Sequence, residues 1–433
     1  MSRATPTPGA DRDDLPTELL LTTCPACGGG DTASFYAVRN VPAHSVLLMD
    51  TREEAVTFPR GDIDLHHCPA CAFVFNAAFD ASLQRYSERY EETQGFSRTF
   101  RTFHRRLAER LIERWDVRRK RILEIGCGKG EFLALLCELG DNSGVGFDPA
   151  FVPDRRPEAG DVELRFYSET YPPQSEAARA EPLPDFVCCK MTLEHIVDVR
   201  TFVAQVRGAL RDGSGTVVFF QVPDAGRVFR DGAFCDVYYE HCSYFTSDSL
   251  VRLFETCGFE VAEAWTDYDA QYLMITAVSS ARALGGATEA GDGSRRPDAE
   301  GADDPPVGRE GRVADLAPVL RAFSERVTVE VAWWLDRIET EIRGGGTVCL
   351  WGGGSKAVSF LSAIDCDLVA FAVDINPHKA GTYLPGSGVE VLAPDDLARR
   401  APTLVIAMNP VYLDEIAADM GARGVKADLV ALG

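Results

Sequence analysis

The sequence contains no apolar run that approaches the roughly twenty residues needed to cross a bilayer. Its first twenty residues are rich in Asp, Pro and Thr and lack a basic start followed by an apolar stretch, so no secretory signal is expected. Basic residues are outnumbered, because 44 Lys and Arg stand against 66 Asp and Glu and give a net charge of −22 at pH 7. Such a charge repels a polyanionic backbone. We therefore expect a soluble, cytoplasmic protein with no membrane or nucleic-acid partner.

A disulfide framework is also missing, although the chain has 13 cysteines. Nine of them are scattered, several inside apolar runs where a thiol packs as a small hydrophobic side chain. The other four form two C-x-x-C pairs, Cys24 with Cys27 and Cys68 with Cys71. Two such turns complete a tetrahedral zinc shell. Four thiolates leave no open position for water or substrate, so we expect the Zn²⁺ to be structural.

At 433 residues the chain is too long for one ordinary core. Residues 281–311 are rich in Gly, Pro and acidic residues, a composition that is typical of a flexible linker. Strand-like and helix-like stretches alternate on both sides of this segment, and such alternation predicts α/β domains. We expect a zinc-binding domain over residues 20–85, an α/β domain over residues 86–280 and a second α/β domain over residues 312–433.

The first α/β domain has a glycine-rich loop between an apolar strand at residues 121–125 and a helix that starts at residue 131. The loop motif is E-x-G-x-G-x-G, formed by Glu124, Gly126, Gly128 and Gly130. Glycines let a backbone approach a ligand closely, and Glu124 can pair with a cationic amino group. The spacing differs from that of dinucleotide sites, and a Walker lysine followed by Ser or Thr is missing. Asp148 ends the next strand, where its carboxylate can accept both ribose hydroxyls.

The ends of two later strands supply further polar side chains. In an open α/β sheet the carboxyl ends of the strands line the ligand crevice, so residues there should face a ligand. These residues are Glu194 and His195 after one strand and Gln221 and Asp224 after the next, and the following loop adds Tyr238, Glu240, His241 and Tyr244. We assign Glu194 to cofactor binding, and Asp224 and Tyr244 to substrate binding.

The loop around His241 combines aromatic rings, an acid and a histidine, which can orient the histidine as a general base. A lone histidine in an aromatic stretch is more often a hydrogen-bonded core residue. Here His195 and His241 come from two segments that converge on one crevice, which favours a functional role.

A second glycine-rich loop follows a strand at residues 347–351 in the C-terminal domain. Backbone amides at a helix start, such as that of Gly353, favour a phosphate, and Lys356 adds positive charge. A nucleotide diphosphate is the expected occupant. The alternative is a loop that only packs.

The strand, glycine loop, helix and following acid resemble the class I S-adenosylmethionine-dependent methyltransferases, whose Rossmann-like sheet binds the methyl donor at the carboxyl ends of its first strands. This resemblance implies that Gly126, Gly128 and Gly130 approach the methionine and ribose parts of S-adenosylmethionine and that Asp148 holds the ribose. It makes the expected fold an α/β methyltransferase domain, flanked by the zinc-binding domain and a second Rossmann-like domain.

The whole layout is similar to the sugar C-methyltransferase family, which acts on nucleotide-linked ketosugars. The similarity rests on the four paired cysteines, on the motif from Glu124 to Gly130, on Leu193-Glu194-His195, on Tyr238-x-Glu240-His241-x-x-Tyr244-Phe245 and, in the C-terminal domain, on Trp351-Gly-Gly-Gly-Ser-Lys-Ala357 and residues 373–381. The second glycine loop and the long linker depart from the family pattern.

The resemblance implies that the acceptor lies between the two α/β domains. A proton next to its ketone is removed, and the resulting enolate attacks the donor methyl group. The base is then His241, with Glu240 orienting it or sharing the proton, and Tyr238 and His195 bind the substrate or stabilise the enolate. Tyr90 is expected to cap the donor or the acceptor.

Several alternatives stay open. Tyr86 fits the capping place nearly as well as Tyr90. An O- or N-methyltransferase on the same framework needs only a base for a hydroxyl or an open amine site. An NAD-dependent epimerase or dehydrogenase would use the C-terminal glycines, but their spacing is poor and no clear Tyr-x-x-x-Lys pair lies nearby. The acidic charge and intact donor motif disfavour a zinc-based interaction module, and the sequence is compatible with a monomer or a homodimer.

Overall fold

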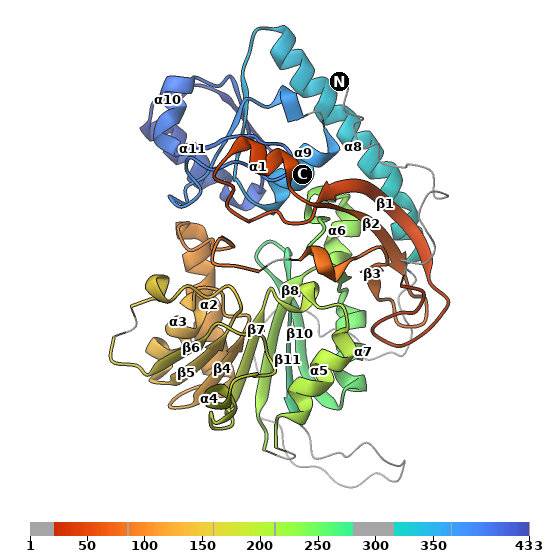
Figure 1. Cartoon of the computed structure of the whole chain (residues 1–433), viewed down its shortest axis with the longest axis vertical. Helices are drawn as coiled ribbons and strands as arrows, with labels where there is room; N and C mark the ends of the chain where they lie inside the picture. The colour runs from red at the N-terminus through yellow and green to blue at the C-terminus, as the bar shows by residue number, and fades with distance from the viewer. Residues whose placement is uncertain are drawn as a thin grey trace.

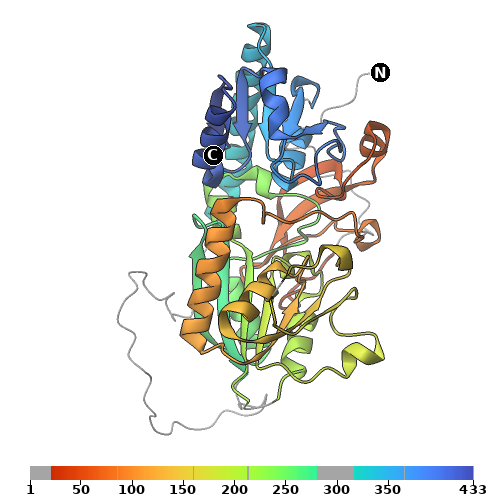
Figure 2. The same ribbon diagram turned by 90° about the vertical axis from the view of Figure 1, so that its left-hand side faces the viewer.

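The computed structural model describes residues 21–84, 86–158, 160–211, 214–279, 316–364 and 366–432. The expected linker, residues 281–311, lies outside these ranges, as do the first twenty residues. Three β-sheets organise the described chain. Figures 1 and 2 show the C-terminal sheet stacked end to end with the central sheet, while the N-terminal strands lie beside the junction.

The N-terminal sheet has four antiparallel strands in the order β1-β2-β3-β9. They are β1 (Ala33–Pro42), β2 (Arg60–His67), β3 (Val74–Asn76) and β9 (Ser243–Tyr244), with helix α1 (Arg52–Thr57) between β1 and β2. Strand β9 joins the sheet with Tyr244 opposite Val74 and Ser243 opposite Phe75. This pairing ties the loop that contains His241 to the N-terminal domain.

The central sheet has seven strands in the order β10-β11-β8-β7-β4-β5-β6. They are β4 (Arg121–Ile125), β5 (Ser143–Phe147), β6 (Leu164–Tyr167), β7 (Phe186–Lys190), β8 (Val217–Pro223), β10 (Phe259–Asp267) and β11 (Tyr272–Ser279). Strands β4 to β8 are parallel, and β11 and β10 form an antiparallel edge. One face packs under α2 (Arg98–Trp115) and α3 (Glu131–Gly140), and the other under α5 (Val199–Gly208) and α7 (Ser247–Thr256). Two short helices, α4 (Glu176–Arg179) and α6 (Ala225–Asp231), precede β7 and follow β8. The expected α/β class is confirmed.

The inner strands of this sheet place charged residues near their carboxyl ends. In β4, Ile122 packs beneath α2 and α3, and Leu123 and Ile125 face the opposite core. A parallel strand covered on both faces is apolar almost throughout. Glu124 in β4 and Lys190 at the end of β7 break this pattern. Charged groups are rarely buried without a partner, so they indicate a polar site at this edge.

The C-terminal domain has a five-stranded parallel sheet in the order β14-β13-β12-β15-β16. Its strands are β12 (Val348–Trp351), β13 (Phe371–Val373), β14 (Val391–Leu392), β15 (Leu404–Ala407) and β16 (Asp428–Ala431). Helices α8 (Ala317–Arg343) and α9 (Ser355–Ala363) cover one face, and α10 (Leu397–Arg400) and α11 (Leu413–Ala422) cover the other. None of the helices in the described ranges combines the length and hydropathy of a membrane span.

Helix α8 connects the parts of the molecule through one core. The Phe323 ring lies edge-on to Phe229 of α6, with ring centroids 5.3 Å apart, and to Tyr36 of β1 at 5.0 Å. Further along α8, the Trp334 ring lies 5.7 Å from that of Phe360 on α9. One hydrophobic cluster thus spans the N-terminal sheet, α6 and the C-terminal sheet. These segments are therefore expected to unfold together.

Truncation of Phe323 tests this shared core. The side chain is fully buried, so Phe323→Ala should lower the free energy of unfolding by about 3–5 kcal/mol through lost burial and a new cavity. Chemical denaturation followed by circular dichroism measures the change. Val329→Ala is the matched control on the same helix, because Val329 is 70% exposed and its truncation should change the free energy by less than about 0.5 kcal/mol. Equal stability of the two variants would contradict the shared core.

Candidate active site

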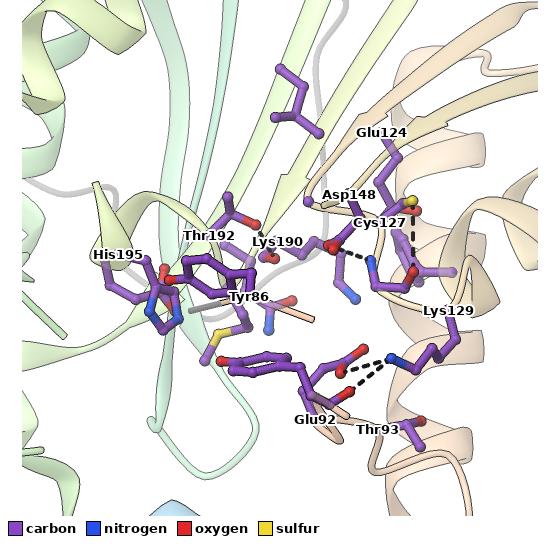
Figure 3. Close-up of a pocket in the computed structure, with 18 of the residues that line it drawn as sticks. Tyr86, Glu92, Thr93, Glu124, Cys127, Lys129, Asp148, Lys190, Thr192 and His195 are labelled. Atoms are coloured by element: carbon purple, nitrogen blue, oxygen red, sulfur yellow. Dashed lines mark hydrogen bonds and ion pairs between the residues drawn. The ribbon is translucent and has the colours of Figure 1, made fainter. Parts of the chain in front are cut away.

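A cavity of about 350 Å³ lies at the carboxyl ends of β4, β5 and β7 (Figure 3). The strands contribute Glu124, Asp148 and Lys190 to its wall, and the segment before α2 contributes Tyr90 and Glu92. This position is the crevice expected at the carboxyl edge of an open α/β sheet.

The glycine loop forms one wall of this first cavity. Gly126 and Gly128 have φ angles of +68° and +55°, a region that side chains disfavour. A Cβ atom at Gly126 would collide with Thr192, and one at Gly128 would lie 2.6 Å from the Glu92 carboxylate. The loop backbone therefore fits closely between two other segments. Gly130, the third predicted glycine, is the N-cap of α3 and lies outside the cavity lining.

Asp148 is held at the end of β5 by two backbone hydrogen bonds. Its Oδ2 accepts from the amide of Gly128 at 2.9 Å, and its Oδ1 accepts from the amide of Ala150 at 2.7 Å. Burial raises the pKa of Asp148 above its ordinary value, and these amides oppose the shift. The carboxylate therefore has one fixed orientation on the cavity wall, from which it can accept hydrogen bonds from hydroxyl groups.

Several buried acceptors of the first cavity have no partner in the described chain. They are Oε2 of Glu124, both carboxylate oxygens of Glu194 and Oε1 of Gln221. Burial raises the pKa of Glu124 to about 7 and that of Glu194 to about 8. An unsatisfied buried polar group costs about 1–3 kcal/mol. A ligand that brings amino and hydroxyl donors would remove this cost.

The two predicted histidines lie next to each other on the wall. Nδ1 of His195 donates to the backbone carbonyl of Glu240 at 3.0 Å, which leaves Nε2 as an acceptor in the neutral ring. The ring centroids of His195 and His241 are 5.0 Å apart, and that of Tyr238 lies 4.0 Å from that of His241. Burial holds the pKa of His241 well below its ordinary value, so its imidazole is neutral and can accept a proton.

A second cavity of about 1020 Å³ opens between the central sheet and the C-terminal domain. It shares part of its wall with the first cavity. The shared residues are Val46, Glu92, Thr93, Gln94, Met191, Tyr238, His241 and Ser355. Tyr238 and His241 therefore face both cavities, whereas His195 lines only the first. Ligands in the two cavities would meet at this wall.

Glu240 differs from its expected role. Its carboxylate accepts hydrogen bonds from Nδ1 of His44 at 2.9 Å, from the Ser45 amide at 2.8 Å and from the Ser45 hydroxyl. Burial raises the pKa of Glu240, but these bonds outweigh burial and hold it below its ordinary value. In the described chain the carboxylate lines neither cavity and makes no hydrogen bond to His241. Glu240 instead orients His195, through its backbone carbonyl.

Of the substrate residues predicted from the sequence, Tyr90 lines the first cavity and Lys356 the second. The Lys356 ammonium lies 2.7 Å from the Asp236 carboxylate, which it shares with Arg227. The amide of Gly353 donates to Oδ2 of Asp374 at 2.8 Å. That amide is therefore not free for a phosphate, which differs from expectation.

Asp224 and Tyr244 are not among the residues that line either cavity. Asp224 is the N-cap of α6, where its Oδ1 accepts from the amide of Gly226 at 2.9 Å. Tyr244 belongs to β9, and its ring centroid lies 6.0 Å from that of Phe229. Asp224 thus caps a helix and Tyr244 packs in a core, and neither side chain lines a cavity.

The sequence analysis missed several polar residues of the first cavity, and four of them matter for its charge. They are Glu92, His104, Lys129 and Lys190. Burial raises the pKa of Glu92 to about 7. Nζ of Lys190 lies 3.0 Å from Nε2 of His104 on α2. A lysine at the end of a buried strand was a usable signal, whereas nothing near His104 separates it from the other polar residues of α2.

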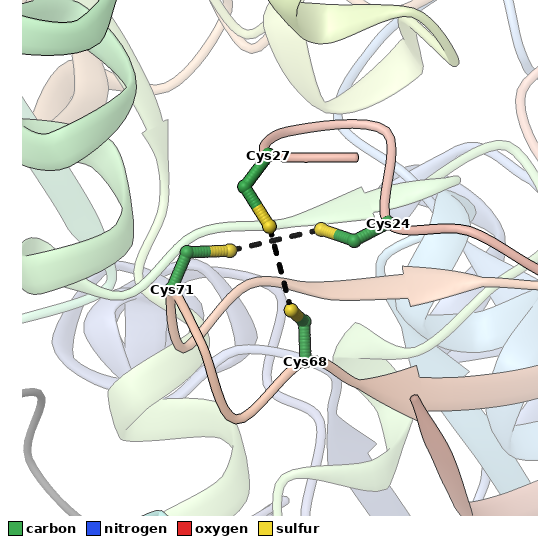
Figure 4. Close-up of side chains that lie close together, drawn as sticks. All are labelled: Cys24, Cys27, Cys68 and Cys71. Atoms are coloured by element: carbon green, nitrogen blue, oxygen red, sulfur yellow. Dashed lines mark hydrogen bonds between the residues drawn. The ribbon is translucent and has the colours of Figure 1, made fainter. Parts of the chain in front are cut away.

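The four paired cysteines converge at one end of the N-terminal sheet (Figure 4). Sγ of Cys24 lies 3.6 Å from that of Cys71, and Sγ of Cys27 lies 3.6 Å from that of Cys68. Sulfur atoms in this arrangement can hold a metal ion. None of the four lines either cavity, so the cluster is separate from the candidate active site.

Comparison with known proteins gives matches over both α/β domains. Residues 96–264 match a family described as "Methyltransferase domain", and residues 310–427 match a family described as "C-methyltransferase C-terminal domain". The chain is also 26% identical over 317 residues to C-methyltransferase NovU of Streptomyces niveus, across 68% of this chain and 67% of NovU.

Solved structures are similar over part of the chain. The 1,6-didemethyltoxoflavin-N1-methyltransferase of Burkholderia thailandensis is 18% identical, with a TM-score of 0.31, over 41% of this chain and 78% of that chain. Magnesium protoporphyrin IX methyltransferase of Synechocystis PCC 6803 is 14% identical, with a TM-score of 0.33, over 44% of this chain and 90% of that chain.

The glycine loop, the acid at the end of β5 and the family matches define a class: the chain is an S-adenosylmethionine-dependent methyltransferase. The first cavity fits this donor, because its unsatisfied Glu124 and Glu194 carboxylates suit the donor's ammonium and hydroxyl groups. Within the class, the match of residues 310–427 to a C-methyltransferase C-terminal domain and the 26% identity to NovU support a C-methyltransferase family. The resemblance to C-methyltransferases drawn from the sequence is confirmed, and the ketosugar acceptor stays a prediction.

The raised pKa of Glu194 predicts a pH-dependent stability of the donor-free protein. An acid with a raised folded-state pKa stabilises the fold fully below its unfolded value, here 4.5, and this contribution is lost as the pH rises to about 8. The wild type should therefore lose free energy of unfolding relative to Glu194→Gln across this range. Urea denaturation of both proteins at the two ends of the range measures the loss.

Glu113→Gln is the control for this experiment, because Glu113 is exposed on α2 and should show no such trend. A difference between wild type and Glu194→Gln that stays constant with pH would show that the pKa of Glu194 is not raised.

Proposed function

We propose that this C-methyltransferase methylates a carbon next to the ketone of a nucleotide-linked ketosugar through an enolate. The observation that carries the proposal is the shared wall of the two cavities, where His241 and Tyr238 face both. A base at this wall can reach an acceptor in the second cavity on the side that faces the donor. In this proposal the enzyme is cytoplasmic and acts on a small molecule.

Removal of a carbon-bound proton needs a base and a hydrogen-bond donor for the oxyanion that forms. Neutral His241 accepts the proton. Burial raises the pKa of Tyr238 well above its ordinary value, so its phenol stays protonated and donates to the ketone oxygen as this becomes the enolate oxygen. His195 presents an acceptor at Nε2 and therefore does not donate to that oxygen in its neutral form.

The bound donor supplies a methyl group on a sulfonium sulfur, which the enolate carbon attacks as the C–S bond breaks. The chain holds the proton of the reacting carbon on His241 during this step. Val46 and Met191 belong to the same shared wall, where their apolar side chains limit the access of water to the enolate.

The second cavity is large enough for a nucleotide-linked sugar. Its volume of about 1020 Å³ reaches the upper end of the range of about 300–1,000 Å³ for small-molecule sites. Most basic side chains on its wall pair with acids of the same wall, as Arg227 and Lys356 do with Asp236. Arg98 is the lining residue whose guanidinium has no ion pair in the described chain. We therefore assign phosphate recognition to Arg98 and to the backbone amides that begin α9.

Solvent deuterium exchange tests the enolate. A panel of nucleotide-linked 4-ketosugars is incubated in D₂O with the enzyme and S-adenosylhomocysteine, without the methyl donor. The wild type should exchange the proton next to the ketone, and His241→Gln should lower the rate at least about 100-fold, because the base is lost. Mass spectrometry and NMR measure the exchange and identify the carbon.

His378→Gln is the matched control, because His378 is exposed and lines neither cavity, and it should keep the wild-type rate. Near-normal exchange by His241→Gln would show that another group is the base. Bound S-adenosylhomocysteine with no exchange into any ketosugar would contradict the proposal and favour an O- or N-methyltransferase.

We also propose that the cysteine cluster holds a structural Zn²⁺. A tetrahedral site with Zn–S bonds of about 2.3 Å has sulfur atoms about 3.8 Å apart, and the Cys24–Cys71 and Cys27–Cys68 pairs lie 3.6 Å apart. Four thiolates close the coordination shell, so the metal would take no part in the reaction.

The zinc proposal predicts one Zn²⁺ per chain, and Cys24→Ser should lose the metal together with thermal stability. Metal analysis by mass spectrometry and thermal denaturation measure the two effects. Cys137→Ala is the control, because it removes a buried thiol of α3 outside the cluster, and it should retain the metal. Full zinc content in Cys24→Ser would contradict the four-thiolate site.

A further inference from the structure

Lys190 and Glu124 lie on one face of the central sheet, at the edge of the first cavity. Strand β7 pairs with β4 so that Cys188 lies opposite Glu124, and the Cys188 thiol donates to Oε1 of Glu124 at 3.8 Å. Residues two apart in a strand share a face, so Lys190 projects on the same side as Cys188. Figure 3 shows Lys190 and Glu124 on the strand side of the cavity, opposite Glu92.

The two lysines of the first cavity differ in their partners. Nζ of Lys129 donates to the carbonyl oxygens of Tyr90 at 2.8 Å and Ala150 at 3.4 Å and lies 3.4 Å from the Glu92 carboxylate. These contacts use all three donors of an ammonium group. The Lys190 ammonium makes one hydrogen bond in the described chain, to His104, so two of its donors are available to a ligand.

His104 fixes the position of the Lys190 ammonium. Burial, with the charge of Lys190, holds the pKa of His104 well below its ordinary value, so Nε2 of the neutral ring accepts from Nζ of Lys190 at 3.0 Å. The same ammonium lies 3.9 Å from the centroid of the Phe132 ring, a cation–π distance. Contacts from α2 and α3 thus hold the lysine beside the cavity.

The donor's amino-acid group carries an ammonium and a carboxylate on one carbon atom. At the first cavity Glu124 offers an unsatisfied buried acceptor, and Lys190 offers unused cationic donors on the same face. The lining contains no arginine, and all three N–H donors of Lys129 already have acceptors within the protein. Lys190 is therefore the cationic group of this lining that can bind the donor's carboxylate.

We propose that Lys190 binds the α-carboxylate of S-adenosylmethionine while Glu124 binds its α-ammonium, and that His104 is a positioning residue for Lys190. This inference rests on the assignment of the first cavity to the methyl donor.

Calorimetric affinities for three ligands test the inference: S-adenosylhomocysteine, its analogue without the carboxyl group and its analogue without the amino group. Lys190→Met should weaken S-adenosylhomocysteine binding about 10- to 100-fold, because a hydrogen-bonded charge pair is lost. It should leave the affinity for the decarboxylated analogue unchanged. Glu124→Gln should weaken S-adenosylhomocysteine and leave the deaminated analogue unchanged. His104→Gln should also weaken S-adenosylhomocysteine binding and spare the decarboxylated analogue, but with a smaller loss of affinity than Lys190→Met.

Lys426→Met is the matched control, because Lys426 is exposed and lines neither cavity, and it should bind all three ligands as the wild type does. Lys190→Gln repeats the test with a polar replacement that keeps a similar length, in case the methionine variant does not fold.

An equal loss of affinity for S-adenosylhomocysteine and for the decarboxylated analogue in both Lys190 variants would overturn the inference, since the lysine would then only shape the pocket. Wild-type affinity that does not change when the carboxyl group is removed would overturn it as well. Failure of the wild type to bind any of the three ligands would instead overturn the assignment of the first cavity to the donor, and this inference with it.

Discussion

The buried carboxylate of Glu240 is the interaction on which the geometry of the active site depends. A carboxylate removed from water needs hydrogen bonds that replace its hydration, and here they come from His44 and Ser45 in the N-terminal domain. The backbone carbonyl of the same residue orients His195. Because His241 follows directly in the chain, the hydrogen bonds that satisfy this buried carboxylate also fix the candidate base. Strand β9 holds the other end of this loop on the N-terminal sheet.

Charge is distributed differently in the two cavities. The first contains several buried carboxylates, Lys129 with all its donors in use, and Lys190 with donors to spare in the described chain. Acceptors and a free cation together suit a zwitterionic ligand with hydroxyl groups. On the wall of the second, most cations are paired with acids, and Arg98 keeps its charge available. His241 and Tyr238, the proposed reacting groups, lie where the cavities meet, and burial keeps both of them neutral. These two groups can therefore exchange protons with an acceptor from a neutral state.

The N-terminal domain contributes to the site although its cysteine cluster is separate from it. Its four-stranded sheet includes β9 from the middle of the chain, and its core continues through α6 and α8 into the C-terminal sheet. A metal that closes the two cysteine turns would stabilise this sheet, and with it the placement of His44 and Ser45 against Glu240. No cysteine of the cluster lines a cavity. The cluster would therefore act on the candidate active site only through the packing and hydrogen bonds of the N-terminal domain.

The sequence by itself determined the features that depend on short spacings. The C-x-x-C turns, the glycine loop after β4 and Asp148 at the end of β5 follow from local geometry, and so does the α/β class. Only the tertiary structure decided the partners of buried charges: Glu240 meets His44 across 196 residues, and His104 of α2 meets Lys190. It also placed Asp224 and Tyr244 outside both cavities and paired Lys356, on the wall of the second cavity, with Asp236. The physical reason is that the charge, protonation and orientation of a buried side chain depend on groups that distant segments bring to it, and spacing along the chain does not encode those groups.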